Sequence, residues 1–373
     1  MIIAGEASGD LHGASLIKEL LLIDSGLKIC GIGGDKMIAA GMDAQYHIKN
    51  MAFLGFAEVV KHIPFIKKVQ RDLIEKIKND GIKTVVLIDY PGFNLSIAKK
   101  LKKLGVDIFY YISPQLWAWG KGRIEKIRKL VKKMIVVFPF EKDFYAEHNI
   151  DAAYVGHPLI EQIAAYKFLS KDEFFSKFGL DKDKKILLLL PGSREQEIKR
   201  IFPACIEAAS RLSSELNLQT VVACSSNINE EVFSSLTDKN DFKIIKGFTY
   251  ELLKYSGFGI IKSGTSTLEA GLFALPFIVV YSTSRITYTL GKMLIKVKNI
   301  AMANIISGED VVDELIQDDV NAETIYQKAK TTINDKAKYD TIKQKLEKIK
   351  SKLGEPGASK RTAEIVYAGL NER

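Results

Sequence analysis

Two carboxylates stand in a glycine-rich segment near the start of the chain, where an apolar stretch gives way to a helical pattern. Residues 1–4 are apolar, and Glu6, Ser8 and Asp10 follow them among three glycines. Glycines permit a tight turn, and carboxylates accept hydrogen bonds from sugar hydroxyls. The segment lacks the lysine of a phosphate-binding loop and the spacing of a dinucleotide fingerprint. It therefore predicts a site for sugar hydroxyls, while a helix-capping turn built on Ser8 or Asp10 is an equal alternative.

Asp89 ends the apolar run 84–88 and is followed by a Pro-Gly turn. A carboxylate at the end of a buried strand lies where the core meets a cleft, so burial raises its pKa toward that of a useful general base. The alternative is that Asp89 only accepts hydrogen bonds from turn amides. His12 and His157 are rival bases, although a histidine beside a proline, as at 157–158, is more often structural.

In the second half of the chain, two strand-to-helix turns have the composition of a nucleotide site. The first contains Gly192, Ser193 and Arg194 after the apolar run 186–190. Amides at a helix N-terminus and the two-pronged guanidinium of Arg194 together suit a diphosphate, and a plain capping turn is the alternative. The second turn supplies hydroxyls and amides for phosphate oxygens, and a carboxylate one turn into the helix for both hydroxyls of a ribose. Its residues are Ser263, Gly264, Thr265, Ser266 and Glu269.

Apolar and aromatic side chains cluster beside basic ones in the first half. Both tryptophans fall within residues 117–119, directly before a lysine- and arginine-rich helical pattern at 121–133. Such a combination fits an anionic bilayer surface or an acyl chain, whereas core packing is the alternative for each residue alone. The candidates are Phe53, Leu54, Phe56, Ile63, Phe65, Ile66, Trp117 and Trp119.

Composition limits the class of protein. The chain has 373 residues, 47% of them hydrophobic and 27% charged, which allows a buried core and excludes general disorder. No apolar run approaches the roughly 18 residues of a membrane-spanning helix. Glu6 and Asp10 interrupt the start, so we expect no signal peptide and a cytoplasmic protein. Cys30, Cys205 and Cys224 are an odd number and far apart, and we expect buried free thiols.

The net charge is +9, from 54 basic and 45 acidic residues. This balance suits nucleic acid, an anionic membrane surface or a phosphorylated substrate. The basic excess lies mainly in the first 160 residues, beside the apolar and aromatic candidates. Because no nucleic-acid recognition motif accompanies the charge, we expect no nucleic-acid partner.

Short β-branched runs alternate with helical patterns along nearly the whole chain, which predicts two doubly wound α/β domains with parallel sheets. We expect an N-terminal domain at 1–165, a C-terminal domain at 166–335, and a purely helical, lysine-rich tail at 336–373 that packs on the N-terminal domain or on a partner subunit. In such sheets ligands bind beyond the carboxyl ends of the strands, where the turns above lie. The expected strands are 1–4, 28–32, 83–89, 107–112, 134–138, 153–156, 185–190, 219–224, 242–246, 258–262 and 277–281.

Seven segments, taken in order, resemble the lipid-A-disaccharide synthase family. The match runs from the first residues to about residue 308, and the helical tail matches only in character. The segments are AGEASGD at 4–10, IDYPGFN at 88–94, SPQLWAW at 113–119, FPFE at 138–141, GHP at 156–158, LPGSR at 190–194 and SGTSTLE at 263–269.

The resemblance implies a fold and an activity. The fold is the GT-B type, in which two Rossmann-like domains face one cleft. The activity is that of an inverting glycosyltransferase, which joins UDP-2,3-diacylglucosamine to 2,3-diacylglucosamine 1-phosphate, releases UDP and forms a β-1,6-linked disaccharide, the precursor of lipid A. It implies no metal cofactor, because Arg194 and helix-terminal amides can stabilise the leaving UDP.

The resemblance also implies roles for individual residues. Asp89 matches the proposed base and Glu6 a second active-site carboxylate. The UDP contacts are the two turns that contain Arg194 and Glu269. The family often has a second Asp where this chain has Gly92, which leaves Asp89 as the sole acid in that turn. The acceptor or cleft positions are Ser8, Asp10, Gln115 and Asn304.

The expected partners are the UDP-sugar donor, the acylated sugar phosphate and the cytoplasmic face of the inner membrane, to which the protein binds peripherally. A homodimer is left open. The alternatives are another two-domain enzyme that uses a UDP sugar, such as an N-acetylglucosaminyltransferase with a different acceptor or a UDP-sugar epimerase, and, from another class, a nucleic-acid-binding module.

Overall fold

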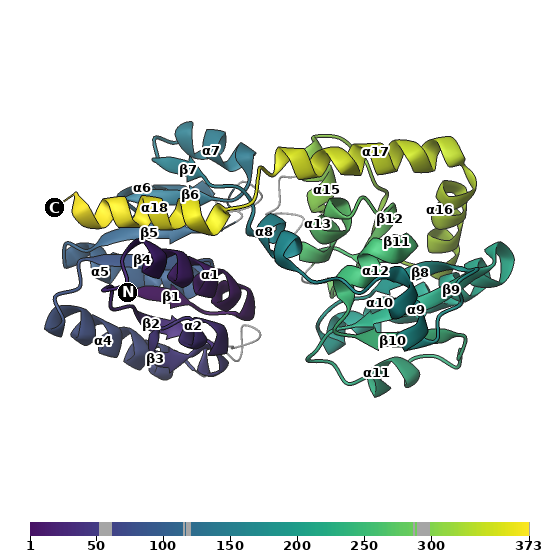
Figure 1. Cartoon of the computed structure of the whole chain (residues 1–373), viewed down its shortest axis with the longest axis horizontal. Coiled ribbons are helices and arrows are strands. Elements are labelled where there is room, and N and C mark those ends of the chain that lie inside the picture. The colour runs from purple at the N-terminus through teal and green to yellow at the C-terminus, as the bar shows by residue number, and fades with distance from the viewer. Residues whose placement is uncertain (52–61, 115, 117–120, 286–287, 289–298, 373) are drawn as a thin grey trace. The chain divides into compact units, whose positions relative to one another are not determined.

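The structure of the protein is a computed structural model that describes residues 1–51, 62–114, 116, 121–285, 288 and 299–372. These residues form two compact units (Figure 1). Unit 1 comprises Met1–Glu161 and Leu353–Arg373, and unit 2 comprises Gln162–Lys352. The expected tail at 336–373 is thus divided between the two units.

Unit 1 is built on a parallel sheet of seven strands in the order β3-β2-β1-β4-β5-β6-β7. The order reverses at β1, since β2 and β3 lie on one side of it and β4 to β7 on the other. The strands β1, β4 and β5 are apolar along nearly their whole length because helices cover both faces. Their bounds are β1 (Ile2–Ala4), β2 (Cys30–Gly33), β3 (Asp43–His47), β4 (Thr84–Ile88), β5 (Asp107–Tyr111), β6 (Lys133–Val136) and β7 (Ala152–Tyr154).

The side chains of alternate residues in these strands lie on opposite faces of the sheet. Val85 and Leu87 pack in a core cluster with side chains of α4, α5 and α6. On the other face, Gly369 of α18 lies against the ring of Phe109, and α18 packs on α1 (Figure 1). The helices of this unit are α1 (Ala7–Ile23), α2 (Asp35–Ala39), η1 (Ile48–Asn50), α4 (Ile63–Asn79), α5 (Pro91–Lys103), α6 (Lys121–Leu130), α7 (Pro139–Ala146) and α18 (Ala358–Asn371), and α8 (Pro158–Ala165) spans the boundary.

Unit 2 repeats the plan with a parallel sheet in the order β10-β9-β8-β11-β12-β13, which reverses at β8. Its strands are β8 (Lys185–Leu190), β9 (Leu218–Cys224), β10 (Phe242–Lys246), β11 (Ser256–Lys262), β12 (Phe277–Tyr281) and β13 (Glu314–Ile316). Its helices are α9 (Lys171–Phe178), α10 (Glu195–Leu216), α11 (Glu231–Ser234), α12 (Thr249–Tyr255), α13 (Thr265–Leu272), α15 (Met302–Ser307), η2 (Gln317–Asp319), α16 (Ala322–Asn334) and α17 (Lys336–Lys352). The topologies of the two sheets confirm the predicted doubly wound class.

Two strands were not predicted, β3 and β13. Both lie at the edge of their sheet. β3 has the sequence Asp-Ala-Gln-Tyr-His and no fully buried residue, so it lacks the apolar run that marked the other strands. β13 has only three residues, too few to show a period.

The apolar side chains of α17 are buried within unit 2. Ile342, Leu346 and Ile349 of α17 are buried, and α17 packs against α13 and α15. Three free cysteines are all buried, as expected. Within the described ranges, no helix combines the length and the apolar character needed to cross a membrane.

Candidate active site

The first candidate site lies where the sheet of unit 1 reverses its order. Ala4 at the end of β1 is paired in register with Ile88 at the end of β4, so the segments that follow these strands leave the sheet side by side. One begins with Gly5 and Glu6, and the other with Asp89. A Cβ on Gly5 would lie only 2.2 Å from a ring carbon of Tyr90, which explains why this position needs a glycine.

Asp89 is held in an unusual backbone conformation. Its φ is 45°, that of Tyr90 is 46°, and that of Ile112, which follows the neighbouring strand β5, is 64°. Non-glycine residues rarely adopt positive φ, and a β-branched one at such a φ is a clear outlier. Backbone strain of this kind persists only where surrounding contacts enforce it, and it concentrates at functional sites.

Three hydrogen bonds enforce the conformation of Asp89. Its amide donates to the carbonyl of Tyr111 over 3.0 Å. Its carbonyl accepts from the hydroxyl of Tyr110 at 2.6 Å and from Nδ2 of Asn94 at 2.7 Å. All three bonds use the backbone of Asp89, and none of them uses its carboxylate.

Burial raises the pKa of Asp89 to about 6, and the nearby charge of Glu6 adds to this effect, against a hydrogen bond from the Tyr90 backbone that lowers it. A carboxylate with such a pKa is ionised at neutral pH yet more basic than an ordinary aspartate, as a general base should be. Burial instead lowers the pKa of His12 to about 4 and that of His157 to about 3. Asp89 is thus a stronger base than either rival histidine.

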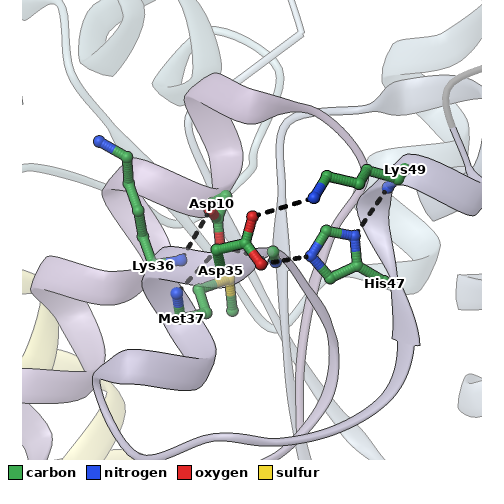
Figure 2. Close-up of polar contacts among 7 residues, drawn as sticks. Asp10, Asp35, Lys36, Met37, His47 and Lys49 are labelled. Atoms are coloured by element: carbon green, nitrogen blue, oxygen red, sulfur yellow. Dashed lines mark hydrogen bonds and ion pairs between the residues drawn. The ribbon is translucent and has the colours of Figure 1, made fainter.

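The other predicted residues of the first turn have different surroundings. Ser8 is exposed on the first turn of α1. The buried carboxylate of Asp10 instead accepts from the amides of Gly34, Lys36 and Met37 at 2.7, 3.1 and 3.0 Å, and so caps the short helix α2. Figure 2 shows this cap, with Asp35 bonded separately to His47 and Lys49. Asp10 therefore has a structural task that uses both of its oxygens.

The side chain of Asn304 also forms hydrogen bonds within the protein. Its Nδ2 donates to the carbonyl of Val312 and to Glu314, and its Oδ1 accepts from the amides of Val311 and Val312. It is only 1% exposed. Gln115, the remaining predicted acceptor residue, lies outside the described residues.

The second candidate site is a cavity of about 610 Å³ in unit 2, at the carboxyl ends of its strands. It lies where this sheet reverses its order, between the segments that follow β8 and β11, which is where doubly wound sheets bind nucleotides. All eight residues predicted to bind UDP line it: Gly192, Ser193, Arg194, Ser263, Gly264, Thr265, Ser266 and Glu269.

Two cations in this cavity share one carboxylate. Oε1 of Glu197 accepts from Nη1 of Arg194 and from Nζ of Lys262, both at 3.0 Å. Burial acts to raise the pKa of Glu197, but the charges and hydrogen bonds of Lys262 and Arg194 outweigh it and lower that pKa. Gly192 has a φ of 127°, and a Cβ there would lie 2.8 Å from Oε2 of Glu197, so the turn needs a glycine to pass over the carboxylate.

The turn after β11 places a helix N-terminus and a carboxyl at the same cavity. Gly264 precedes α13, whose first residue is Thr265, and the hydroxyl of Ser263 donates to the carbonyl of Ile300 over 3.1 Å. Burial raises the pKa of Glu269 to about 7. Glu269 thus has a pKa near neutral pH and lines the same cavity as Arg194 and Lys262.

Some cavity residues were missed by sequence reasoning. Glu197 and Lys262 flank the predicted turns at positions three after Arg194 and one before Ser263, so their proximity to these motifs was an available signal. Thr249 and Tyr250 start α12 and belong to no recognisable motif. They reach the cavity because β10 ends beside β9. The spacing of residues in the sequence does not show which strands are neighbours, so this contact could not be predicted.

The predicted membrane-facing residues are only partly within the described chain. Ile63, at the start of α4, is 40% exposed. Phe65 and Ile66 are half-buried and pack against the core of unit 1. Phe53, Leu54, Phe56, Trp117 and Trp119 lie outside the described residues. In the parts of the chain that the structure describes, no group of three or more His, Cys, Asp or Glu side chains is placed to hold a metal ion.

Comparison with solved structures supports the fold. The S. aureus MnaA structure with UDP aligns with a TM-score of 0.69 at 17% identity, covering 100% of this chain and 96% of the other. A glycotransferase of kitacinnamycin aligns with a TM-score of 0.67 at 11% identity, covering 99% of this chain and 98% of the other. These likenesses confirm the predicted GT-B class of two Rossmann-like domains.

Comparison of sequences is more specific. The lipid-A-disaccharide synthetase family model matches residues 1–368. A lipid-A-disaccharide synthase of Geobacter metallireducens is 38% identical over 376 residues, which are 100% of this chain and 97% of the relative. The match extends beyond the seven motifs to nearly the whole chain, and the resemblance stated from those motifs is confirmed. The chain therefore belongs to the lipid-A-disaccharide synthase family.

Proposed function

We propose that the protein transfers the diacylglucosamine unit of UDP-2,3-diacylglucosamine to the 6-hydroxyl of 2,3-diacylglucosamine 1-phosphate, releasing UDP and forming the β-1,6-linked disaccharide. Its family is one of glycosyltransferases that make the lipid A disaccharide. The alternative of a UDP-sugar epimerase is not favoured, because relatives that are 38% identical over the whole of this chain are lipid-A-disaccharide synthases.

The donor occupies the cavity of unit 2. The observation that carries this assignment is the convergence of all eight predicted residues on that one cavity. Arg194 and the N-terminus of α13 hold the diphosphate, since a helix N-terminus and a guanidinium both favour phosphate oxygens. Glu269 accepts hydrogen bonds from the ribose hydroxyls.

The acceptor is activated in unit 1. The acceptor oxygen forms a bond to C1 of the donor sugar while the bond from C1 to the β-phosphate oxygen breaks. The hydroxyl proton passes to Asp89, and the electron pair of the broken bond leaves with UDP. A single displacement of this kind inverts the α-linkage of the donor to a β-linkage, so one base is sufficient and no covalent intermediate is needed. Glu6 supports Asp89 by raising its pKa.

The protein acts at the cytoplasmic face of the inner membrane, to which it binds peripherally. Both substrates carry acyl chains, so they reside in or on a bilayer. Lys126 and Lys129, both exposed on α6, provide positive charge, which attracts anionic lipid headgroups. A homodimer is compatible with this arrangement.

The reaction is tested with the purified protein, the acylated donor and the acylated acceptor. We expect UDP and a disaccharide phosphate in equal amounts, with the β-configuration read from the coupling constant of the new anomeric proton. Glucosamine 1-phosphate without acyl chains should be a poor acceptor. Equal turnover of the acylated and unacylated acceptors would contradict the lipid assignment.

A further inference from the structure

The donor cavity contains one more cation than the predicted UDP contacts include. Lys262 is the last residue of β11, and it lines the cavity together with Arg194. Its side chain is 17% exposed, whereas that of Arg194 is 59% exposed. Lys262 is therefore the more deeply placed of the two cations.

The ammonium of Lys262 lies beside the start of α13. A Cβ built on Gly264, the residue before that helix, would lie 3.9 Å from Nζ of Lys262. Free amides of a helix N-terminus carry partial positive charge. The helix terminus, Lys262 and Arg194 thus contribute three positive groups to one side of the cavity.

Glu197 is the acidic counterpart of these groups. Its Oε1 bonds to both cations, and its Oε2 is buried without a hydrogen-bond partner among the described residues. An unpaired buried carboxylate oxygen is costly. The cavity is lined by two cations, Arg194 and Lys262, and by two carboxyl groups, Glu197 and Glu269. Because burial raises the pKa of Glu269 to about 7, Glu269 is only partly ionised at neutral pH, and the remaining excess of positive charge favours a more highly charged anion.

We propose that Lys262 binds the β-phosphate of the donor, and that Glu197 is a positioning residue that holds Lys262 and Arg194 in the empty cavity until the diphosphate replaces it as their anion. The inference rests on the proposed role of the cavity as the UDP site. When the bond to the sugar breaks, negative charge grows on the β-phosphate oxygen. The ammonium of Lys262 stabilises that charge, so it acts on the leaving group as well as on binding.

A simpler reading is that the contact between Lys262 and Glu197 only joins β11 to α10. The two readings predict opposite changes in UDP affinity when Glu197 loses its charge. If the contact is only structural, loss of either partner weakens the cavity and lowers the affinity for UDP. If Glu197 competes with the diphosphate for the two cations, removing its charge raises the affinity, whereas removing the charge of Lys262 lowers it.

The test is the binding of UDP and of uridine, which lacks phosphates, measured by isothermal titration calorimetry. Lys262→Met should raise the Kd for UDP by about 10-fold or more, as expected for loss of a hydrogen bond to a charged group, and leave the Kd for uridine unchanged. Lys262→Arg, which keeps the positive charge, should retain most of the UDP affinity that Lys262→Met loses. Glu197→Gln should lower the Kd for UDP without changing that for uridine. Lys199→Met, which removes an exposed lysine paired with Glu195 on α10, is the matched control and should change neither.

Three results would overturn this assignment. The first is an unchanged UDP affinity in Lys262→Met, and the second is a UDP affinity that falls in Glu197→Gln. The third is an equal loss of UDP and uridine affinity in Lys262→Met, which would indicate a damaged cavity instead of a lost phosphate contact. Failure of the unaltered protein to bind UDP would instead reject the cavity as the donor site, so the two proposals fail in different ways.

Discussion

Asp89 and Glu269 are carboxyl groups whose pKa values lie close to neutral pH. Burial is the main cause in both cases and gives about 6 for Asp89 and about 7 for Glu269. We propose different chemistry for the two groups. Asp89 follows β4, near the charge of Glu6, and is proposed to take a proton. Glu269 lines the cavity of unit 2 and is proposed to accept hydrogen bonds from hydroxyls.

The pH dependence of transfer should report the ionisation of Asp89. Because a base works only when deprotonated, kcat/KM should rise with pH to a plateau, with a midpoint near the pKa of about 6. Glu6→Gln removes a charge that raises this pKa, so the midpoint should move to lower pH. The measurement is kcat/KM for the acylated acceptor between pH 5 and 8.5. A midpoint that does not move in Glu6→Gln would contradict the coupling of the two carboxylates.

Uridine binding should report the ionisation of Glu269. If its carboxylate accepts from the ribose hydroxyls, the nucleoside selects the ionised form, and affinity should increase as pH rises through about 7. Uridine is the correct ligand because it has no phosphate that titrates in this range. Glu269→Gln should abolish the pH dependence and weaken binding. Calorimetry at pH 6 and 8 checks this, and a pH-independent Kd in the unaltered protein would remove Glu269 from the ribose contact.

Individual elements explain which residues the sequence could identify. Turns that follow apolar strands were recognisable because parallel strands end at one edge of a sheet, and the structure places Asp89 and Arg194 in such turns. Asp10 shows the limit of this reasoning. Its position in a glycine-rich turn suggested a sugar ligand or a cap on its own helix, yet it caps α2, which lies more than twenty residues further along the chain. Only the pairing of β1 with β2 brings them together.

The cap on α2 is testable. Asp10→Ala leaves three amides at the start of α2 without their acceptor, two of them in buried hydrogen bonds, and should lower the free energy of unfolding by about 2 kcal/mol. Asp35→Ala is the matched control on the same short helix (Figure 2), because Asp35 forms only exposed ion pairs with His47 and Lys49. Its effect should be much smaller. Denaturant unfolding measures both, and equal effects would contradict a capping role for Asp10.

At the scale of the whole molecule, the chain builds the same topology twice and then returns to the first unit. Repetition was visible in the sequence as alternating strand and helix patterns. The sequence predicted that the whole tail at 336–373 packs on the N-terminal domain or on a partner subunit, but it did not separate α17 from α18, because their amphipathic patterns are alike while their partners differ. α17 packs in unit 2, and α18 packs on α1 in unit 1. Shape decides the second contact, since Gly369 lets α18 approach the ring of Phe109 closely.

Gly369→Val should therefore destabilise unit 1 selectively. A Cβ at this position would lie 2.3 Å from the ring of Phe109, a side chain that is 2% exposed, so the helix must move away and lose packing. We expect a loss of about 1–3 kcal/mol, with UDP affinity unchanged because the donor cavity belongs to unit 2. Gly122→Ala on α6, where a Cβ meets nothing within 4 Å, is the control. Loss of UDP binding in Gly369→Val would contradict this independence of the two units.

We propose that unit 1 supplies the base and that unit 2 holds the donor. The most direct test compares UDP affinity with transfer rate in Asp89→Asn and Arg194→Ala. Asp89→Asn should bind UDP as tightly as the unaltered protein and lose about 10²-fold or more of the transfer rate. Arg194→Ala should chiefly lose UDP affinity. Substantial transfer by Asp89→Asn, or unchanged UDP affinity in Arg194→Ala, would contradict the account.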